Sequence, residues 1–369
     1  MSGLSIVEAF LKNYGFLINI TIVLNVLTSC VCYIAPIISL YSRKKLIKLI
    51  KLIDTGFYTY SDEDIFQTSE YSAKDLLFKE FMVCAFVWVT YIGMTLTPLV
   101  VTLLLEDHEN SVFDLLYVAW VPFGIETGQQ FFFSYILQFI STIPLYTSFC
   151  SKILFTNNIS IEFEYQCEKL KYALRTICQR VSNKFEMSDT ISNANAYSAN
   201  GSKFVFCDED EFLRKFSECV KHYRQLQKCL DYFSEWFNLI FSCELTYGFV
   251  SFALIGYVMI TGTGNTATDG KYVCLLGLFG GQLCYQCVAG EIIFTIEETI
   301  IDELYNIAWY EQTPKVKKCV QLFLNELQQQ RKLRGFKIFP ASIPIFASIA
   351  RTSYSYLNLL SKMMHKVNN

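Results

Sequence analysis

Six apolar stretches, each long enough to cross a lipid bilayer as a helix, constrain this chain more than any other feature. A membrane-spanning helix needs about 20 predominantly apolar residues. Stretches of this kind lie at 14–41, 80–105, 129–155, 236–261, 272–296 and 339–363. They do not alternate as barrel strands do, and lipid admits only helices or closed barrels. The sequence therefore predicts an all-α polytopic membrane protein with six visible spans and a shorter amphipathic helix at 313–332, before the last span.

The composition agrees with a membrane protein. Hydrophobic residues make up 52% of the chain and charged residues 18%, and the mean hydropathy is +0.30; soluble domains are about 25% charged. The net charge of −3 excludes a broadly basic surface for nucleic acid. The 14 cysteines have no regular spacing, which favours small apolar core residues over a disulfide scaffold.

The distribution of Lys and Arg predicts the orientation in the membrane, because basic loops face the cytosol. The segments 42–51 and 156–235, and the residues flanking the amphipathic helix, are rich in Lys and Arg, whereas 106–128 has none. All loops fit one alternating topology, which places the C-terminus outside the cell. We expect one transmembrane domain, 1–369. It comprises three spans in 14–155, a cytosolic helical extension in 156–235 with a Ser/Asn-rich disordered tract at 183–203, and three spans in 236–363.

Motifs for catalysis or metal binding do not appear in the sequence. Cys284 and Cys287 form a lone CxxC inside an apolar stretch, without the second pair that a zinc site needs. The glycines at 277–281 lack the preceding strand and following helix start of a phosphate loop. We therefore predict that the chain is not an enzyme and holds no metal and no cofactor.

The last apolar stretch carries a polar stripe that turns apolar. At 3.6 residues per turn, five side chains share one face: Ser348, Thr352, Ser355, Leu359 and Met363. Hydroxyls on such a helix can simply bond their own backbone, so helix packing is one reading. With Arg351 nearby, a water-filled pore is the other reading, in which Leu359 and Met363 close the pore by excluding water. A single helix cannot enclose a pore, so this reading requires an oligomer.

The C-terminal part of the chain resembles the insect odorant receptors. The features that carry the resemblance are Trp309-Tyr310, a short helix ending in polar and basic residues at 328–331, Gly335, and a Ser-Tyr motif at 353–357. Leu357 replaces the family's usual Phe at the end of this motif. The segment 218–222 also resembles the family's entry into its fifth helix. The related gustatory receptors end in Gln-Phe where this chain has Lys362-Met363, so the odorant branch is favoured.

The resemblance implies the odorant-binding subunit of a heterotetrameric, odorant-gated cation channel in the plasma membrane of olfactory neuron dendrites. Its implied partners are an obligate co-receptor, a volatile odorant and the lipid bilayer. The family's gate lies three and seven residues after the motif Tyr356, at Leu359 and Met363. The implied subunit anchor comprises Trp309, Tyr310, Val316, Val320 and Leu324. The family has seven spans against six visible here, so we expect its first helix to be missing from this sequence.

The resemblance also places an odorant pocket among the outer halves of the family's second, third, fourth and sixth helices. Such sites are apolar and aromatic, with few polar groups. The residues expected there are Phe16, Ile20, Tyr91, Met94, Thr95, Phe132, Phe133, Tyr135, Ile136, Leu275, Leu278 and Gln282. Plain core packing is the alternative for each of them. A ligand oxygen could bond to Tyr91, Tyr135 or Gln282.

Other classes of membrane protein fit the sequence less well. A G-protein-coupled receptor would need a cytosolic C-terminus and an Asp-Arg-Tyr-like motif after its third helix. A transporter would show two related halves with broken helices. A G-protein-coupled chemoreceptor and a gustatory-receptor-like channel nevertheless stay open as alternatives at this point.

Overall fold

The computed structural model describes residues 16–55, 57, 60, 81–82, 84–85, 87–89, 91–93, 95–96, 128–177, 209–261, 266–307, 309–329 and 332–367. Parts of the predicted span 80–105, including Met94, the segment 106–127 and the tract 183–203 lie outside the described residues. Within these described residues the fold is all-α apart from one short hairpin, which confirms the predicted class.

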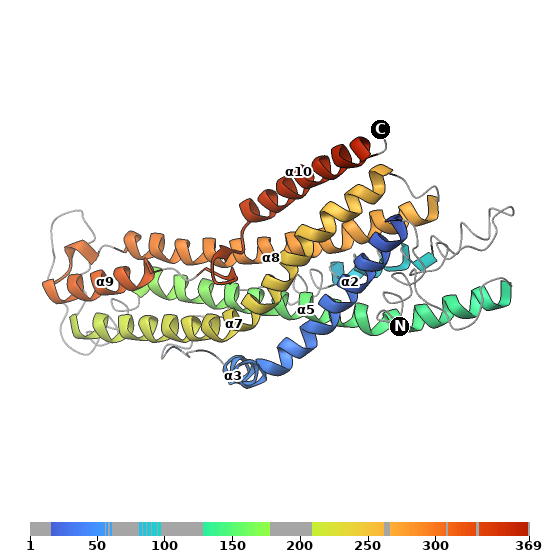
Figure 1. Ribbon diagram of the computed structural model, residues 1–369. Helices are drawn as coiled ribbons and strands as arrows, with labels where there is room; N and C mark the ends of the chain where they lie inside the picture. The colour runs from blue at the N-terminus through green and yellow to red at the C-terminus, as the bar shows by residue number, and fades with distance from the viewer. Residues whose placement is uncertain are drawn as a thin grey trace, which may run out of the picture.

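Three long helices form the frame of the molecule (Figure 1). They are α5 (Gly128–Arg175), α7 (Glu209–Thr261) and α8 (Thr266–Asn306), with 48, 53 and 41 residues. At 1.5 Å per residue they extend for roughly 72, 80 and 62 Å. A bilayer core is only about 30 Å thick. About half of each helix or more must therefore project beyond the membrane.

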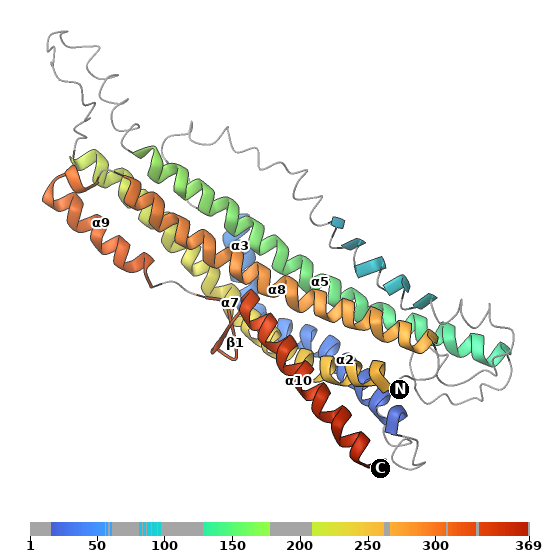
Figure 2. The same ribbon diagram turned by 90° about the horizontal axis from the view of Figure 1, so that it is seen from above.

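The remaining helices pack around this frame. Helix α2 (Phe16–Tyr41) lies against α5 and α7, and α3 (Arg43–Asp54) turns away after it and contacts α7. Helix α9 (Pro314–Leu327) follows the 3₁₀ helix η3 (Trp309–Glu311) and lies at one end of the bundle (Figures 1 and 2). We call this end the α9 end. The apolar stretches of α5, α7 and α8 lie toward the opposite end.

Three helices of the described residues are long and apolar enough to cross a membrane, within Ile22–Tyr41, Glu209–Ile260 and Tyr272–Asn306. The predicted spans 129–155 and 339–363 correspond to α5 and to α10 (Ile343–Val367). Their hydropathy is lower because hydroxyl, amide and basic side chains interrupt them. The buried apolar side chains form two clusters, one toward the α9 end and one in the apolar half of the bundle.

A β-hairpin, which was not predicted from the sequence, separates α9 from α10. Strands β1 (Arg334–Gly335) and β2 (Phe339–Pro340) pair antiparallel. The amphipathic helix consequently ends at Leu327 rather than 332, and the last helix begins at Ile343 rather than 339. Apolar composition alone could not show this break, because the hairpin is itself largely apolar.

Helix α7 holds the hairpin in a strained turn. Phe336 and Lys337 have left-handed backbones, with φ of 51° and 60°, which bulky residues seldom adopt. Their backbone N–H groups donate to Ser242 Oγ at 2.6 Å and to Asn238 Oδ1 at 2.8 Å. A Cβ on Gly335 would lie 2.8 Å from side chains of α7, so only glycine permits this close approach. The hairpin thereby fixes the start of α10 against α7.

A buried histidine sits in the polar first half of α7, before the apolar stretch begins. His222 Nδ1 lies 2.8 Å from the Tyr60 hydroxyl, and Nε2 lies 3.1 Å from Gln166 Oε1. In the neutral ring, this arrangement puts the proton on Nε2 and lets Nδ1 accept from Tyr60. Burial, with a smaller contribution from the charge of Lys169, lowers the pKa of His222 to about 3.

Acidification is expected to destabilise the protein through His222. The unfolded chain binds a proton there with a pKa near 6.5, whereas the folded chain does not until about pH 3. Stability is therefore lost progressively as the pH falls below 6.5, by about 2 kcal/mol at pH 5. The variant His222→Gln, which keeps a donor and an acceptor, should show a smaller fall in melting temperature between pH 7.5 and 5.0. An equal fall in both proteins, measured in detergent, would contradict this role.

Candidate functional site

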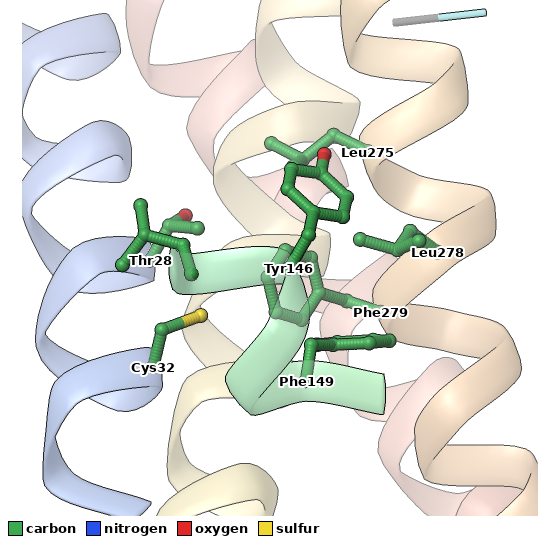
Figure 3. A pocket seen from close by; sticks show the side chains of 8 residues that line it. Thr28, Cys32, Tyr146, Phe149, Leu275, Leu278 and Phe279 are labelled. Atoms are coloured by element: carbon green, nitrogen blue, oxygen red, sulfur yellow. The ribbon is translucent and has the colours of Figure 1, made fainter. Parts of the chain in front are cut away.

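An apolar pocket lies in the apolar half of the bundle, between α2, α5 and α8 (Figure 3). Side chains fill it almost completely, leaving a free volume of about 10 Å³, so a ligand would enter only if the helices separate. Its walls are formed by Thr28, Cys32, Leu145, Tyr146, Phe149, Leu275, Leu278 and Phe279. The Tyr146 hydroxyl points toward Leu275 (Figure 3), and the rings of Phe149 and Phe279 meet edge to face with centroids 5.4 Å apart.

Most hydrogen-bonding capacity around the pocket is already used. The Thr28 hydroxyl donates to Leu24 O at 2.8 Å and lies 2.8 Å from the Tyr247 hydroxyl. Ser148 Oγ donates to Cys32 O at 3.0 Å. Because few directional partners remain for a ligand, the pocket would select by shape and hydrophobicity, as apolar small-molecule sites do.

Some residues expected to bind the ligand lie in or behind this wall. Leu275 and Leu278 line the pocket. Tyr91 lies behind it, with its ring centroid 4.2 Å from that of Tyr146 and its hydroxyl 3.2 Å from Thr142 Oγ1. The Tyr135 hydroxyl donates to the backbone oxygen of Thr95, further along α5. Four of the expected residues are thus buried near the pocket without lining it: Ile20, Tyr91, Thr95 and Tyr135.

Other expected residues do not reach the pocket. Phe132, Phe133 and Ile136 are exposed on the outer surface of α5 and do not line this pocket. The buried face of α5 instead follows a spacing of three and four residues: Phe131, Ser134, Tyr135, Gln138, Thr142, Leu145, Tyr146 and Phe149. The side chain of Phe16, in the first turn of α2, lies outside the described residues, as does Met94.

A buried ion pair lies next to the pocket and joins three helices. Lys152 Nζ is 2.9 Å from Glu244 Oε1, and the side chains are only 4% and 6% exposed. Gln282 Nε2 donates to the same carboxylate oxygen, so Gln282 is engaged by Glu244 and does not line the pocket. Lys152 Nζ also lies 5.4 Å from the ring centre of Phe149, a residue of the pocket wall.

This ion pair was not predicted from the sequence. The available signal was one Lys and one Glu, each inside a predicted span, because a charge in a span needs a partner or water. The inward-facing Tyr146, Phe149 and Phe279 were not predicted either.

Helix α10 packs through one face, mainly on α7 and also on α8. Leu357 is buried against Gly256, where a Cβ would approach Leu357 Cδ2 to 3.1 Å. Ser353 Oγ donates to Phe249 O at 3.3 Å, and the ring of Tyr356 lies 5.2 Å from that of Phe249. Glycine thus lets the two helices come close, and the C-terminal half of α10 diverges from the bundle (Figure 2).

The predicted polar stripe lies on the exposed face of α10. Ser348, Thr352, Ser355 and Leu359 are all exposed. Thr352 Oγ1 donates to Ser348 O at 2.8 Å and Ser355 Oγ to Arg351 O at 3.0 Å. The hydroxyl hydrogens of Thr352 and Ser355 are therefore used within the helix, while their oxygen lone pairs stay available. The side chain of Met363 lies outside the described residues.

The expected subunit anchor needs correction. Val316, Val320 and Leu324 are at most 5% exposed and belong to the chain's own core at the α9 end. They face α7 and α8 because they form the apolar side of an amphipathic helix. Trp309 is half-buried, whereas Tyr310 and the previously unconsidered Leu322 are exposed. Among the described residues of η3 and α9, these last two are the large apolar side chains that are exposed to a neighbouring molecule.

The fold and the pocket together define a multi-pass helical membrane protein with an internal apolar site. Residues 16–354 match the family model described as 7tm Odorant receptor. The chain therefore belongs to the odorant receptor family, as its C-terminal motifs predicted, and the G-protein-coupled and gustatory alternatives are not favoured. The family is not an enzyme family.

Curated relatives come from insects. Odorant receptor 83a of Drosophila melanogaster is 21% identical over 309 residues, covering 75% of this chain and 66% of that protein. The odorant receptor coreceptors of Drosophila melanogaster and Anopheles gambiae are 22% and 26% identical, over 31% and 27% of this chain. These two matches cover 24% and 22% of the coreceptors. The chain thus spans less than two thirds of the length of the curated relatives it matches.

The fold is that of solved olfactory receptors. The insect olfactory receptor OR5 from Machilis hrabei superposes with a TM-score of 0.72 at 13% identity, over 97% of this chain and 85% of that one. The structure of OR5 in complex with eugenol gives 0.66 at 18% identity, over 94% and 81%. At these identities the likeness establishes the fold.

Proposed function

We propose that this chain is the odorant-binding subunit of a heteromeric, odorant-gated cation channel in the plasma membrane of olfactory neurons, with its C-terminus extracellular. The observation that carries the proposal is α10. One face of this helix is fixed to α7, and the other face presents exposed hydroxyls followed by Leu359. A helix with a polar face ending in an apolar side chain suits a pore that closes by excluding water.

The need for a partner follows from the same helix. One α10 cannot surround a pore, so several subunits must meet around an axis. The similarity to two insect coreceptors supports a related chain as the partner. Tyr310 and Leu322, exposed at the α9 end, are suitable contacts for it.

Ligand binding in the pocket can change the position of α10 through the helices that join them. A volatile apolar molecule would separate α2, α5 and α8 where they surround Tyr146 and Phe279. The ion pair of Lys152 with Glu244 links this wall to α7, which carries α10. A ligand opens the pore only by as much as it prefers the open arrangement over the closed one.

Recording from cells that express the chain tests the proposal. Cells with this chain, with an odorant co-receptor, and with both are exposed to a panel of volatile esters, alcohols and ketones. We expect a cation current that requires both chains and responds to one ligand class. Surface-expressed protein without current for any volatile would contradict the proposal.

Narrowing the pocket is expected to change ligand preference. The variant Leu278→Phe adds bulk to the pocket wall, so large ligands should lose potency by about tenfold while small ones change little, since each displaced methylene group is worth about 0.8 kcal/mol. Val273→Phe makes a similar change on the exposed side of α8 and should leave potency unaltered. Equal shifts in both variants, read from dose–response curves, would argue against this pocket.

A further inference from the structure

Helix α10 is exclusively basic. It contains Arg351, Lys362 and Lys366 and no Asp or Glu. This is unexpected for a helix that would line a path for cations. Arg351 and Lys362 are both exposed, and within the described part of the chain neither side chain makes an ion pair.

The phase of the helix places both charges on the face turned away from the bundle. The buried direction is set by Ser353 and Leu357, which contact α7. With about 100° per residue, Ser355 points directly opposite, and Arg351 and Lys362 fall within about 40° of it. Leu359 falls within about 40° on the other flank. The two cations thus share the stripe that carries the proposed gate.

The two cations lie on either side of Leu359 along the helix axis. Arg351 precedes it by eight residues, or about 12 Å, and Lys362 follows by three, or about 4.5 Å. An uncompensated charge facing lipid is costly, so such side chains turn toward water or a partner. Glu244, the acid buried among the described residues of the apolar half, is already paired with Lys152 and cannot neutralise them.

From this arrangement we infer that Arg351 and Lys362 set the ion selectivity of the channel, lowering its permeability to divalent relative to monovalent cations. The inference rests on the proposed function. A fixed positive charge repels a divalent cation twice as strongly as a monovalent one at the same distance. Each copy of this chain in the assembly adds its own pair of charges to the pore.

Reversal potentials test the inference. Channels formed with the co-receptor are recorded in sodium and calcium solutions, for the unaltered chain and for Arg351→Gln, Lys362→Gln and the double variant. We expect the calcium-to-sodium permeability ratio to rise in each single variant and by about three- to tenfold in the double variant. Arg351→Lys keeps the charge and should keep the ratio. Arg334→Gln removes an exposed charge from β1, off the stripe, and should also leave it unchanged.

The possible outcomes separate this inference from the proposed function. An odorant-gated current with an unaltered ratio in all variants overturns the selectivity role and leaves the channel proposal standing. Absence of current from the unaltered pair overturns both. If the variants are not expressed, a measurement on the unaltered channel still tests the inference. Its single-channel conductance should fall more steeply than the salt concentration on dilution, because unscreened positive charge depletes cations; a shallower fall would overturn the inference.

Discussion

Replacing Glu244 with alanine is expected to destabilise the folded protein by about 3–5 kcal/mol, because the change leaves Lys152 charged, buried and without its partner. Lys152 is 4% exposed, so water cannot replace the lost carboxylate. Gln282 loses its hydrogen-bond acceptor in the same change. A large fall in melting temperature in detergent, and loss of protein from the cell surface, are the expected results.

Two further variants separate the buried pair from acidic residues in general. Glu235 lies on the same helix and pairs with Lys45, but its side chain is 59% exposed, so Glu235→Ala should cost less than about 1 kcal/mol. The double variant Lys152→Met with Glu244→Leu removes both charges and should recover most of the loss. Equal melting temperatures for Glu244→Ala and Glu235→Ala would show that the buried pair contributes no more to folding stability than the exposed pair.

The fold class was predictable because the length and composition of apolar stretches report directly on membrane helices. The hairpin between α9 and α10 was not, because its turn depends on distant partners. Phe336 and Lys337 adopt left-handed backbones only where Ser242 and Asn238 on α7 accept their N–H groups. No local pattern in the sequence reports such partners.

The pocket was only partly predictable for a similar reason. The apolar part of α5 is rich in aromatic residues on every side, so composition cannot tell which side faces inward. Phe132 and Phe133 are exposed, whereas Tyr146 and Phe149 line the pocket. The side of α5 that is buried is the side on which α2 and α8 pack. On α5 and α7, Lys152 and Glu244 do mark an inward face, because each is buried as the other's partner.

The stripe on α10 was visible in the sequence because it breaks the apolar composition of its own helix. Its periodicity fixed which residues share a face, and the structure adds the direction of that face. The buried Ser353 and Leu357 turn Ser355 away from the bundle. The amphipathic helix α9 was different, since its apolar side was expected to bind a neighbour and instead covers the chain's own core.

Replacing Leu359 with serine is expected to raise the current in the absence of odorant severalfold, measured with the co-receptor present. Leu359 is 53% exposed on the free face of α10, and an apolar constriction closes a pore by making it unfavourable for water to enter. A hydroxyl at this position lets water remain in the constriction. Met363 follows one turn later, so the pore should open more fully when both residues are replaced.

The matched control is Leu40→Ser, which changes an exposed leucine on α2, away from the free face of α10. Both variants lose the same apolar group from a lipid- or water-exposed position, so any general effect on expression or folding should be shared. A rise in basal current confined to Leu359→Ser would assign the effect to the position of that side chain. Basal current that stays at the control level in Leu359→Ser, while odorants still open the channel, would rule out Leu359 as the gate and leave Met363 or the partner's helix to close the pore.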